Sequence, residues 1–307
     1  MLFSLILHQI LHHSLTLIYM TNPFTRALST KIMIGFGLLS VMLVLVSLIA
    51  NSLPTEGKWV PLLIGVMQNL FVFVLVAMLA ARLCYGKVLA PLKLTVAPRW
   101  QGIAMVVLVC VVSIPAMNWL IDWNEHITFP ESMHDLYLSF KQMEEMAQAE
   151  TGRLLQANNL WMMLLTVAVV GVLTGFGEEI FFRGFLLGAF EQKKGLNIHL
   201  SVWCVGLIFS AMHCQFFGFF PRWILGVWLG YLMVWSGSLW LPVIAHALNN
   251  SIVVVLYYIA EHTQISTTIV EQIGIVPAGE FPWFATASAL LTLALIIATP
   301  RRVFRGG

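Results

Sequence analysis

Eight long apolar stretches dominate this sequence, each close to the length that an α-helix needs to cross a lipid bilayer. A membrane-spanning helix needs about 20 predominantly apolar residues. Only 10% of the 307 residues are charged, whereas soluble domains carry about 25%. The sequence therefore predicts an all-α protein, a polytopic transmembrane helical bundle of about eight spans. The expected spans lie near residues 32–51, 60–81, 101–121, 161–182, 199–217, 222–236, 239–258 and 281–299.

The distribution of basic residues predicts how these spans are oriented. Lys and Arg in short loops favour the cytoplasmic side of a membrane. With eight crossings the basic loops all fall on one side, and the acidic segment 122–159 and the loop 259–280 fall on the other. We therefore expect a multi-pass protein of the plasma membrane with both termini cytoplasmic. The basic residues concerned are Arg26, Lys31, Arg82, Lys87, Lys93, Arg99, Lys193, Lys194, Arg301, Arg302 and Arg305.

Arg222 is the exception to this charge pattern, because it stands at the outer end of the sixth span. That span is short, and we expect it to be tilted or only partly inserted. Long basic side chains can cover apolar surface with their stems and extend the charged group into water. We therefore favour an interfacial, snorkelling Arg222 over a residue of a functional site.

One substantial polar segment, residues 131–157, interrupts the apolar sequence. Ser132, followed three residues later by Asp135, fits a capping box. Apolar residues then recur at steps of three and four, which predicts a helix with one apolar face. These residues are Met133, Leu136, Phe140, Met143 and Ala147. We expect an amphipathic helix on the outer surface, and we favour a lid packed over the bundle over a partner-binding site.

The first residues of the chain form a separate apolar segment. Residues 2–19 contain three histidines but no Lys or Arg. A secretory signal peptide has a positively charged beginning, so that interpretation is rejected. Two alternatives stay open: the segment lies at the membrane interface, or translation starts at Met20.

Three ionisable residues, Glu178, Glu179 and Arg183, lie at the end of the fourth span. An ionisable residue at bilayer depth costs about 2.5–3.5 kcal/mol, so a functional role is its default interpretation. Glu179 and Arg183 are four residues apart and can pair on one helix face. Glu178 is turned about 100° away and has no obvious local partner, which suits a general base. The alternative is that all three residues only link helices.

Two further spans contain polar residues at helical spacing. Phe209 and His213 are four residues apart in the fifth span, and His246 and Asn250 are four apart in the seventh. A helix rises about 1.5 Å per residue, which places these polar groups and Glu178 at depths where they can meet in one buried cavity.

Such a set of side chains suits hydrolysis. A carboxylate with an imidazole can deprotonate water, and a second imidazole with an amide can donate hydrogen bonds to the developing oxyanion. A second interpretation has Glu178, His213 and His246 bind zinc, because two histidines and a carboxylate with an open position form a catalytic zinc site. The chain lacks the HExxH motif that is typical of many zinc proteases.

The polar residues of these three spans, in this order and spacing, resemble the CPBP family. That family comprises the CAAX prenyl endopeptidases and bacteriocin-processing or self-immunity proteins, and it is also called the Abi family. The motifs are Glu178-Glu179-x-x-x-Arg183, Phe209-x-x-x-His213 and His246-x-x-x-Asn250. The likeness extends over about residues 160–258, and the asparagine that ends the third motif is more similar to the prokaryotic branch.

The resemblance implies an eight-helix bundle and an intramembrane endopeptidase of the glutamic type, formerly classed as a metalloprotease. It implies that Glu178 and His213 activate water without a metal cofactor. His246 and Asn250 would stabilise the oxyanion. The supporting residues would be Glu179, Arg183 and Phe209.

Other function classes compete with the endopeptidase. Buried Glu and His also serve proton relays in transporters, but a transporter predicts paired broken helices in two halves. A non-catalytic immunity or scaffold membrane protein and a zinc-dependent membrane protease are further alternatives. For the endopeptidase we expect a membrane-associated peptide or protein substrate and contact with the lipid bilayer, and no nucleic acid. No cofactor is expected, with zinc as the alternative.

These expectations divide the chain into five segments. They are an N-terminal interfacial or mis-started segment (1–31), three N-terminal transmembrane helices (32–121), an external acidic amphipathic segment (122–159), a catalytic core (160–258), and a loop with the last transmembrane helix and a basic tail (259–307).

Overall fold

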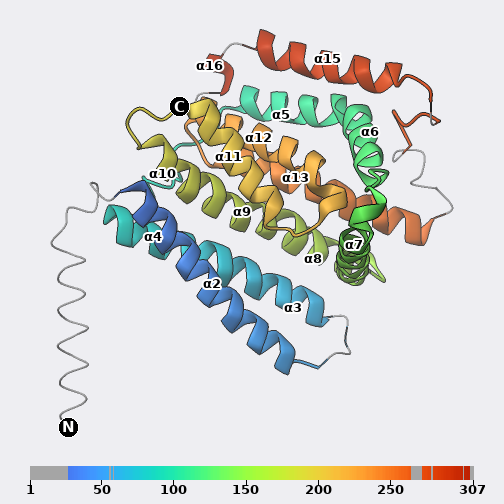
Figure 1. The fold of residues 1–307 in the computed structure, drawn as a ribbon. Helices are drawn as coiled ribbons and strands as arrows, with labels where there is room; N and C mark the ends of the chain where they lie inside the picture. The colour runs from blue at the N-terminus through green and yellow to red at the C-terminus, as the bar shows by residue number, and fades with distance from the viewer. Residues whose placement is uncertain are drawn as a thin grey trace.

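The computed structural model describes residues 27–54, 57, 59–263, 272–277, 279–299 and 301–304. Every regular element in this part of the chain is a helix (Figure 1). The predicted all-α bundle is therefore confirmed. Most of the predicted segment 1–31 lies outside the described residues, and so do residues 264–271 of the predicted outer loop.

The elements follow one another in a simple order. The first part contains α2 (Leu28–Ser52), α3 (Trp59–Met67), η2 (Gln68–Leu75), α4 (Val76–Tyr85), α5 (Trp100–Val112), α6 (Ile114–Glu125), η3 (Glu131–Met133) and α7 (His134–Leu155). The middle contains α8 (Leu160–Thr166), η4 (Val167–Leu173), α9 (Thr174–Glu179), η5 (Ile180–Leu187) and α10 (Gly188–Glu191). The last part contains α11 (Ile198–Ala211), η6 (Phe216–Gly218), α12 (Phe219–Ser236), α13 (Trp240–His262), α15 (Trp283–Ala298) and α16 (Arg301–Phe304).

Within the described residues, five helices are long and apolar enough to cross a membrane. They are Leu28–Ser52, Trp59–Tyr85, Leu160–Glu191, Phe216–Ser236 and Trp240–His262. The pair α5 and α6, bent by 51°, is a sixth candidate. The apolar helices α11 and α15 have only 14 and 16 residues, or about 21 and 24 Å of length, against about 30 Å of hydrocarbon. The chain is a multi-pass membrane protein, and the number of about eight spans stays a prediction.

The boundaries between the fifth and sixth spans differ from the prediction. The predicted span 199–217 ends earlier, because α11 stops at Ala211 and a turn follows in which Cys214 has a φ of 54°. The next helix then begins early, with η6 at Phe216 rather than at residue 222. The predicted short sixth span is therefore wrong, since the segment Phe216–Ser236 has 21 residues.

The long helix from α8 to α10 lies between the other helices of the bundle. Figure 1 shows it between α2 and α4 on one side and α11 to α13 on the other. All eight residues of η5 are buried. A helix surrounded by protein in this way can hold polar side chains that lipid would not tolerate.

Three π-helical segments interrupt the two long helices of this region. They are η2 in the second span, and η4 and η5 in the span that contains the two glutamates. Such segments are rare and are frequent at functional sites. Two carbonyl groups of η4 accept side-chain hydrogen bonds: Val169 from Thr174 at 3.1 Å and Val170 from Asn250 at 3.2 Å.

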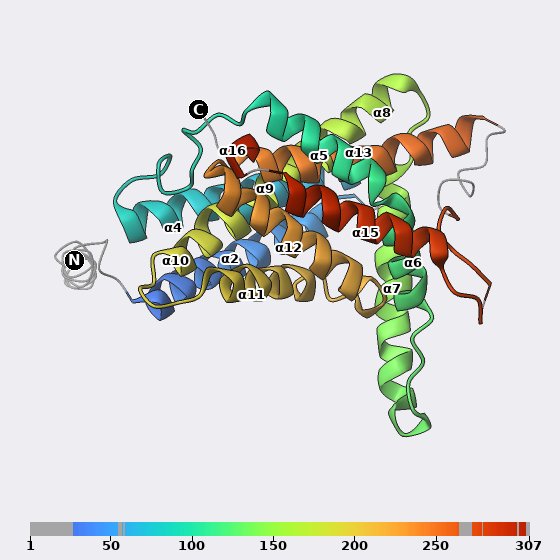
Figure 2. The same ribbon diagram turned by 90° about the horizontal axis from the view of Figure 1, so that it is seen from above.

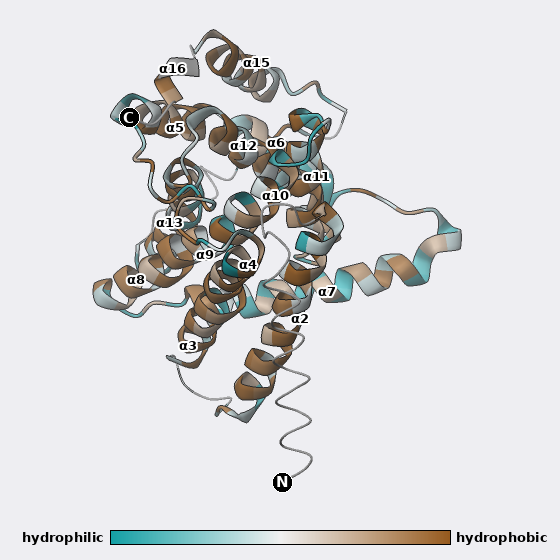
Figure 3. Cartoon of the chain, turned by 90° about the vertical axis from the view of Figure 1, so that its left-hand side faces the viewer, coloured by the Kyte–Doolittle hydropathy of each residue, from teal (hydrophilic) through white to brown (hydrophobic). Residues whose placement is uncertain are grey.

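Helix α7 is the predicted amphipathic helix, and it packs across one end of the bundle. Its ring contacts with η6 include Phe140 stacked on Phe216, with ring centroids 5.1 Å apart. In Figure 2 its first half extends beyond the other helices, and Figure 3 shows polar residues along it in contrast to the apolar bundle. The predicted capping box is wrong. Glu131–Met133 form a 3₁₀ turn in front of the helix, and no side chain caps its first residue.

Candidate active site

The ion pair predicted between Glu179 and Arg183 is present and completely buried. Nη1 of Arg183 lies 2.6 Å from Oε1 of Glu179, and both side chains are 0% exposed. Nη2 of Arg183 donates a second hydrogen bond to the carbonyl of Gly226, at 2.9 Å. Arg183 therefore links the central helix to α12. Its pairing with Glu179 compensates two buried charges, each of which would be costly alone at this depth.

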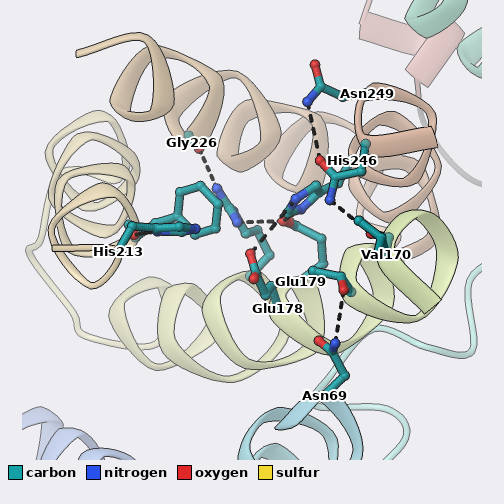
Figure 4. Close-up of polar contacts among 12 residues, drawn as sticks. Asn69, Val170, Glu178, Glu179, His213, Gly226, His246 and Asn249 are labelled. Atoms are coloured by element: carbon teal, nitrogen blue, oxygen red, sulfur yellow. Dashed lines mark hydrogen bonds and ion pairs between the residues drawn. The ribbon is translucent and has the colours of Figure 1, made fainter. Parts of the chain in front are cut away.

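A second partner of Glu179 was not predicted. Nδ1 of His246 lies 2.8 Å from the same Oε1 of Glu179, across 67 residues of sequence (Figure 4). A carboxylate can only accept here, so the Nδ1 of His246 carries the hydrogen. The carboxylate thus sets both the tautomer and the orientation of the imidazole.

Glu178 lies on the other side of the same imidazole. Its Oε2 is 3.9 Å from Nε2 of His246, too far for a hydrogen bond. The Glu178 side chain is 13% exposed, whereas that of Glu179 is 0% exposed. No hydrogen bond to Glu178 occurs among the described residues. The predicted difference between the two glutamates is therefore confirmed. Glu179 is paired and fully buried, whereas the oxygens of Glu178 lie near an imidazole and accept no hydrogen bond from a described residue.

His213 lies in the turn after α11 and not on a helix as predicted. Its Nδ1 is 2.9 Å from the carbonyl oxygen of Phe209. Since a carbonyl only accepts, Nδ1 is the protonated nitrogen and Nε2 has the free lone pair in the neutral ring. His213 interacts electrostatically with Glu178, although no direct hydrogen bond or ion pair joins these two described residues. In Figure 4 the ring extends from its helix end toward the side where Glu178 lies.

Phe209 connects the polar residues through its ring. The residue is 1% exposed, and its ring centroid lies 5.0 Å from that of His213 and 5.9 Å from that of His246. The guanidinium carbon of Arg183 lies 4.5 Å from the same centroid, a cation–π distance. Phe209 therefore fixes the relative position of both imidazoles and screens the Glu179–Arg183 pair from lipid and water.

Asn250 is one turn along α13 from His246, and its amide is directed elsewhere. Its Nδ2 donates to the carbonyl of Val170 in η4, at 3.2 Å. Its Oδ1 lies 3.4 Å from the Nδ2 of Asn249. The structure thus brings Glu178, Glu179 and both histidines together around Phe209, and places Asn250 beside them, with its amide bonded to the central helix.

Two close helix contacts bring these side chains within reach. A Cβ atom built at Gly175 would lie 2.8 Å from the backbone nitrogen of Ala247, next to His246. A Cβ at Gly226 would lie 3.1 Å from the Cα of Gly206. Small residues permit helices to approach closely, and these glycines do so for α9 against α13 and for α11 against α12.

Replacing Gly175 with alanine should lower stability and activity together. The added methyl group meets backbone atoms of α13, so the two helices must separate. Overpacking of this kind costs about 1–3 kcal/mol, and the Glu179–His246 hydrogen bond should lengthen. Gly37→Ala is the matched control, because a Cβ there meets nothing within 4 Å and alanine favours a helix. Equal melting temperatures of the two purified variants would contradict the packing argument.

The sequence interpretation missed Asn69 in the second span. Its side chain is buried, and its Nδ2 donates to Oγ1 of Thr174 at 2.9 Å and to the carbonyl of Gly65 at 2.8 Å. A Cβ at Gly177 would lie 3.0 Å from its Oδ1. Asn69 thus packs against the helical turn of α9 that contains Gly177 and Glu178. An amide in an otherwise apolar run was the signal that could have identified it.

The prediction for Arg222 is wrong. A snorkelling side chain extends its charged group away from the protein, but Nη1 of Arg222 is buried. Its Nη2 donates to Oε1 of Gln215 at 3.0 Å. The reason is the turn after α11, which places Gln215 beside the first turn of α12 and so provides a partner inside the protein.

The zinc site considered from the sequence is not assembled by these side chains. Within the described part of the chain, no group of three His, Cys, Asp or Glu side chains is arranged to hold a metal ion. Glu178 and His246 lie near each other, but His213 does not join them in a group that could bind one metal ion. Zinc requires nitrogen and oxygen ligands about 2.0–2.2 Å from a common centre, and the arrangement described here does not fit it.

Comparison with known proteins agrees with the position of this site. Residues 159–252 match the family model of the type II CAAX prenyl endopeptidase Rce1-like proteins. The uncharacterized protein YpbD of Bacillus subtilis (strain 168) is 30% identical over 88 residues, which cover 26% of this chain and 40% of YpbD. The chain thus matches less than half the length of this relative. No solved structure matches the chain.

The matched segment coincides with the part of the chain that was expected to resemble the CPBP family. It contains Glu178, Glu179, Arg183, Phe209, His213, His246 and Asn250. Residues 159–252 of the chain are therefore similar to the Rce1-like type II CAAX prenyl endopeptidases.

Proposed function

We propose that this protein is an intramembrane endopeptidase that hydrolyses a peptide bond of a membrane-associated peptide or protein with activated water. The observation that supports it most is the contrast between the two glutamates. Glu179 has Arg183 and His246 as partners, while Glu178 faces Nε2 of His246 without a protein donor. A carboxylate held beside an oriented imidazole in a half-closed site is suited to acid–base chemistry on water.

The proposed reaction begins with Glu178 as the base. Its carboxylate accepts a proton from water, and Nε2 of His213 accepts a hydrogen bond from the same water. The hydroxide attacks the carbonyl carbon, and the carbonyl oxygen becomes an oxyanion. When the C–N bond breaks, protonated Glu178 returns the proton to the departing nitrogen. Atoms and charge therefore balance without a further reactant.

The oxyanion needs donors, and His246 is the first. Its Nδ1–H is bonded to Glu179, so Nε2 can donate to the oxyanion only when the ring carries a second proton. In the proposed reaction the ring has taken this proton from solvent before the substrate binds and keeps it throughout, so it enters neither product. Asn250 is the second proposed donor, because its amide has two N–H groups and only one donates to Val170. Glu179, Arg183 and Phe209 hold these groups in place.

The test of this function is a substrate-trapping comparison. Membrane proteomes of cells that produce wild-type protein or the Glu178→Ala variant are compared, with the new N- and C-termini mapped by mass spectrometry. We expect at least one membrane-associated protein to accumulate uncleaved only with the variant. Identical termini in both proteomes, with both proteins present at equal levels, would argue for a non-catalytic scaffold.

Metal removal should leave the activity unchanged. The proposed steps use only side chains and water, and the described residues do not form a zinc-binding group. The measurement is the metal content of purified, active protein, followed by the cleavage rate after exhaustive chelation. Stoichiometric zinc, with activity that disappears on chelation and returns when zinc is added, would refute the metal-free mechanism.

The proposed location is the plasma membrane, with both termini cytoplasmic. Six and eight crossings are both even and leave the two termini on one side, whereas five would separate them; the loop charges favour an even number. Helix α7 follows three apolar segments and should face the other side. Reporter fusions at Glu145 and after Gly307 are therefore expected to report opposite sides of the membrane. Two fusions that report the same side would refute this topology.

A further inference from the structure

Arg222 belongs to a polar chain that connects α7 to the site. Its Nη2 donates to Oε1 of Gln215 at 3.0 Å, and Nε2 of Gln215 donates to Oε1 of Glu144 at 3.2 Å. Gln215 comes from the turn after His213, and Glu144 comes from the middle of α7. One amide thus separates a guanidinium from a carboxylate, and the two charges do not touch.

Each charged group of this polar chain, Arg222 and Glu144, has one buried atom that makes no hydrogen bond to a described residue. Nη1 of Arg222 and Oε2 of Glu144 are buried and have no hydrogen-bond partner among the described residues. Buried donors and acceptors are normally satisfied, and an exception needs an explanation. A guanidinium has five N–H donors in a planar fork, which matches a carboxylate in a two-point contact.

Arg222 lies near the proposed catalytic groups, because its partner Gln215 follows His213 by two residues in the turn after α11. It interacts electrostatically with Glu144 and Glu178, and His213 interacts with both Glu178 and Arg222. Arg183, the other arginine near the site, is occupied by Glu179 and Gly226. Nε of Arg183 and Nη1 of Arg222 are each buried without a hydrogen-bond partner among the described residues. Both terminal nitrogens of Arg183 are used, so Arg222 is the one whose terminal fork can still donate to a ligand.

We propose that Arg222 is a specificity-determining residue that binds a carboxylate of the substrate beside Glu178 and His213, and that Glu144 of α7 competes for it. This inference rests on the peptidase function proposed above and names a feature of its substrate. The carboxylate has two possible sources, the C-terminus of the substrate or an Asp or Glu side chain near the cleaved bond. In both cases the charge of Arg222 holds the peptide at a fixed distance from Glu178.

The charges in this chain favour a carboxylate over a neutral carbonyl group. A cation inside a bilayer-spanning segment is costly unless an anion compensates for it, and Glu144 compensates only through Gln215. A carboxylate from the substrate would contact Arg222 directly, and hydrogen bonds between two charged groups are the stronger kind. Because Glu144 would compete with the substrate carboxylate for Arg222, removing the charge of Glu144 should strengthen substrate binding, and removing the charge of Arg222 should weaken it.

The experiment uses the full-length protein in lipid vesicles and two synthetic peptide libraries. One library has free C-terminal carboxylates and the other has C-terminal amides, and both contain Asp and Glu. Cleavage positions are mapped by mass spectrometry. A C-terminal source predicts cleavage at a fixed distance from the end in the free library only. A side-chain source predicts cleavage at a fixed distance from Asp or Glu in both libraries.

Variants of this chain then test the residues. With the best carboxylate peptide, Arg222→Gln should raise KM by about tenfold to a hundredfold, while cleavage of the peptide with the carboxylate neutralised should change little. Glu144→Gln should lower KM for the carboxylate peptide. Arg222→Lys, which keeps the charge without the fork, should fall between wild type and Arg222→Gln. Arg153→Gln is the matched control, since it removes the charge of an arginine that is 65% exposed on α7, the helix of Glu144.

The outcomes separate this inference from the peptidase proposal. If wild-type protein cleaves neither library, both proposals are contradicted. If it cleaves both libraries without regard to any carboxylate, only the role of Arg222 is overturned. If Arg222→Gln does not fold, the library comparison and Glu144→Gln decide, and a KM that rises in Glu144→Gln would show that the polar chain is structural.

Discussion

Replacing Glu178 with glutamine is expected to abolish peptide hydrolysis while the protein still folds. Glutamine keeps the size of the side chain but cannot accept a proton from water. General acid–base catalysis contributes about 10²–10⁴-fold to a rate, and Glu178 is proposed to act as base and then as acid. The fold should survive, because no hydrogen bond to Glu178 is lost among the described residues and its carboxylate is partly exposed. The measurement pairs the cleavage rate with the melting temperature.

Glu179→Gln is the matched comparison, because the change in chemistry is identical and the position differs by one residue. This variant should lose stability as well as activity, since Oε1 of Glu179 serves both Arg183 and His246. A conservative Glu178→Asp variant should retain a part of the activity, because it keeps a base and moves it back by one methylene. Equal losses of folding in Glu178→Gln and Glu179→Gln would remove the distinction between the two roles.

The predictions that the structure confirms are those set by local physics. The apolar stretches form helices because a bilayer-spanning backbone must satisfy its own hydrogen bonds. The Glu179–Arg183 pair follows from a spacing of four residues on a helix. In each case the sequence within one turn of helix contains the information that the prediction needs.

Several features that the sequence did not reveal depend on contacts beyond one turn of helix. Arg222 was expected at the membrane surface, but its partner Gln215 comes from a turn that the apolar pattern of 199–217 concealed. The bond between Glu179 and His246 spans 67 residues, and helical spacing shows only that His246 and Asn250 share a face. Asn69 was missed because one amide in an apolar run has no periodic pattern. Tertiary contacts decide which polar residues in a membrane protein meet, and a single sequence contains only their spacing.

Replacing Arg183 with methionine is expected to cause the largest loss of stability of any single change in the site. The variant leaves Glu179 buried at 0% exposure without its cation, and the carbonyl of Gly226 loses its donor. Breaking a buried ion pair by removing one partner costs about 3–5 kcal/mol. Methionine fills much of the same volume, so the effect comes from charge and not from a cavity. Thermal or denaturant unfolding of the purified protein in detergent measures it.

The double variant Glu179→Gln with Arg183→Met distinguishes a charge effect from a packing effect. Removing both charges leaves no uncompensated ion, and buried pairs replaced by neutral residues of similar volume are often nearly neutral in stability. The double variant should therefore be more stable than Arg183→Met alone, although its activity should stay low because His246 loses the carboxylate that orients it. If the double variant is as unstable as the sum of the two single variants, the residues act independently, and the instability of Arg183→Met does not come from the uncompensated charge of Glu179. Recovery of stability without recovery of activity would separate the role of the pair in the fold from the role of Glu179 in presenting His246 to Glu178.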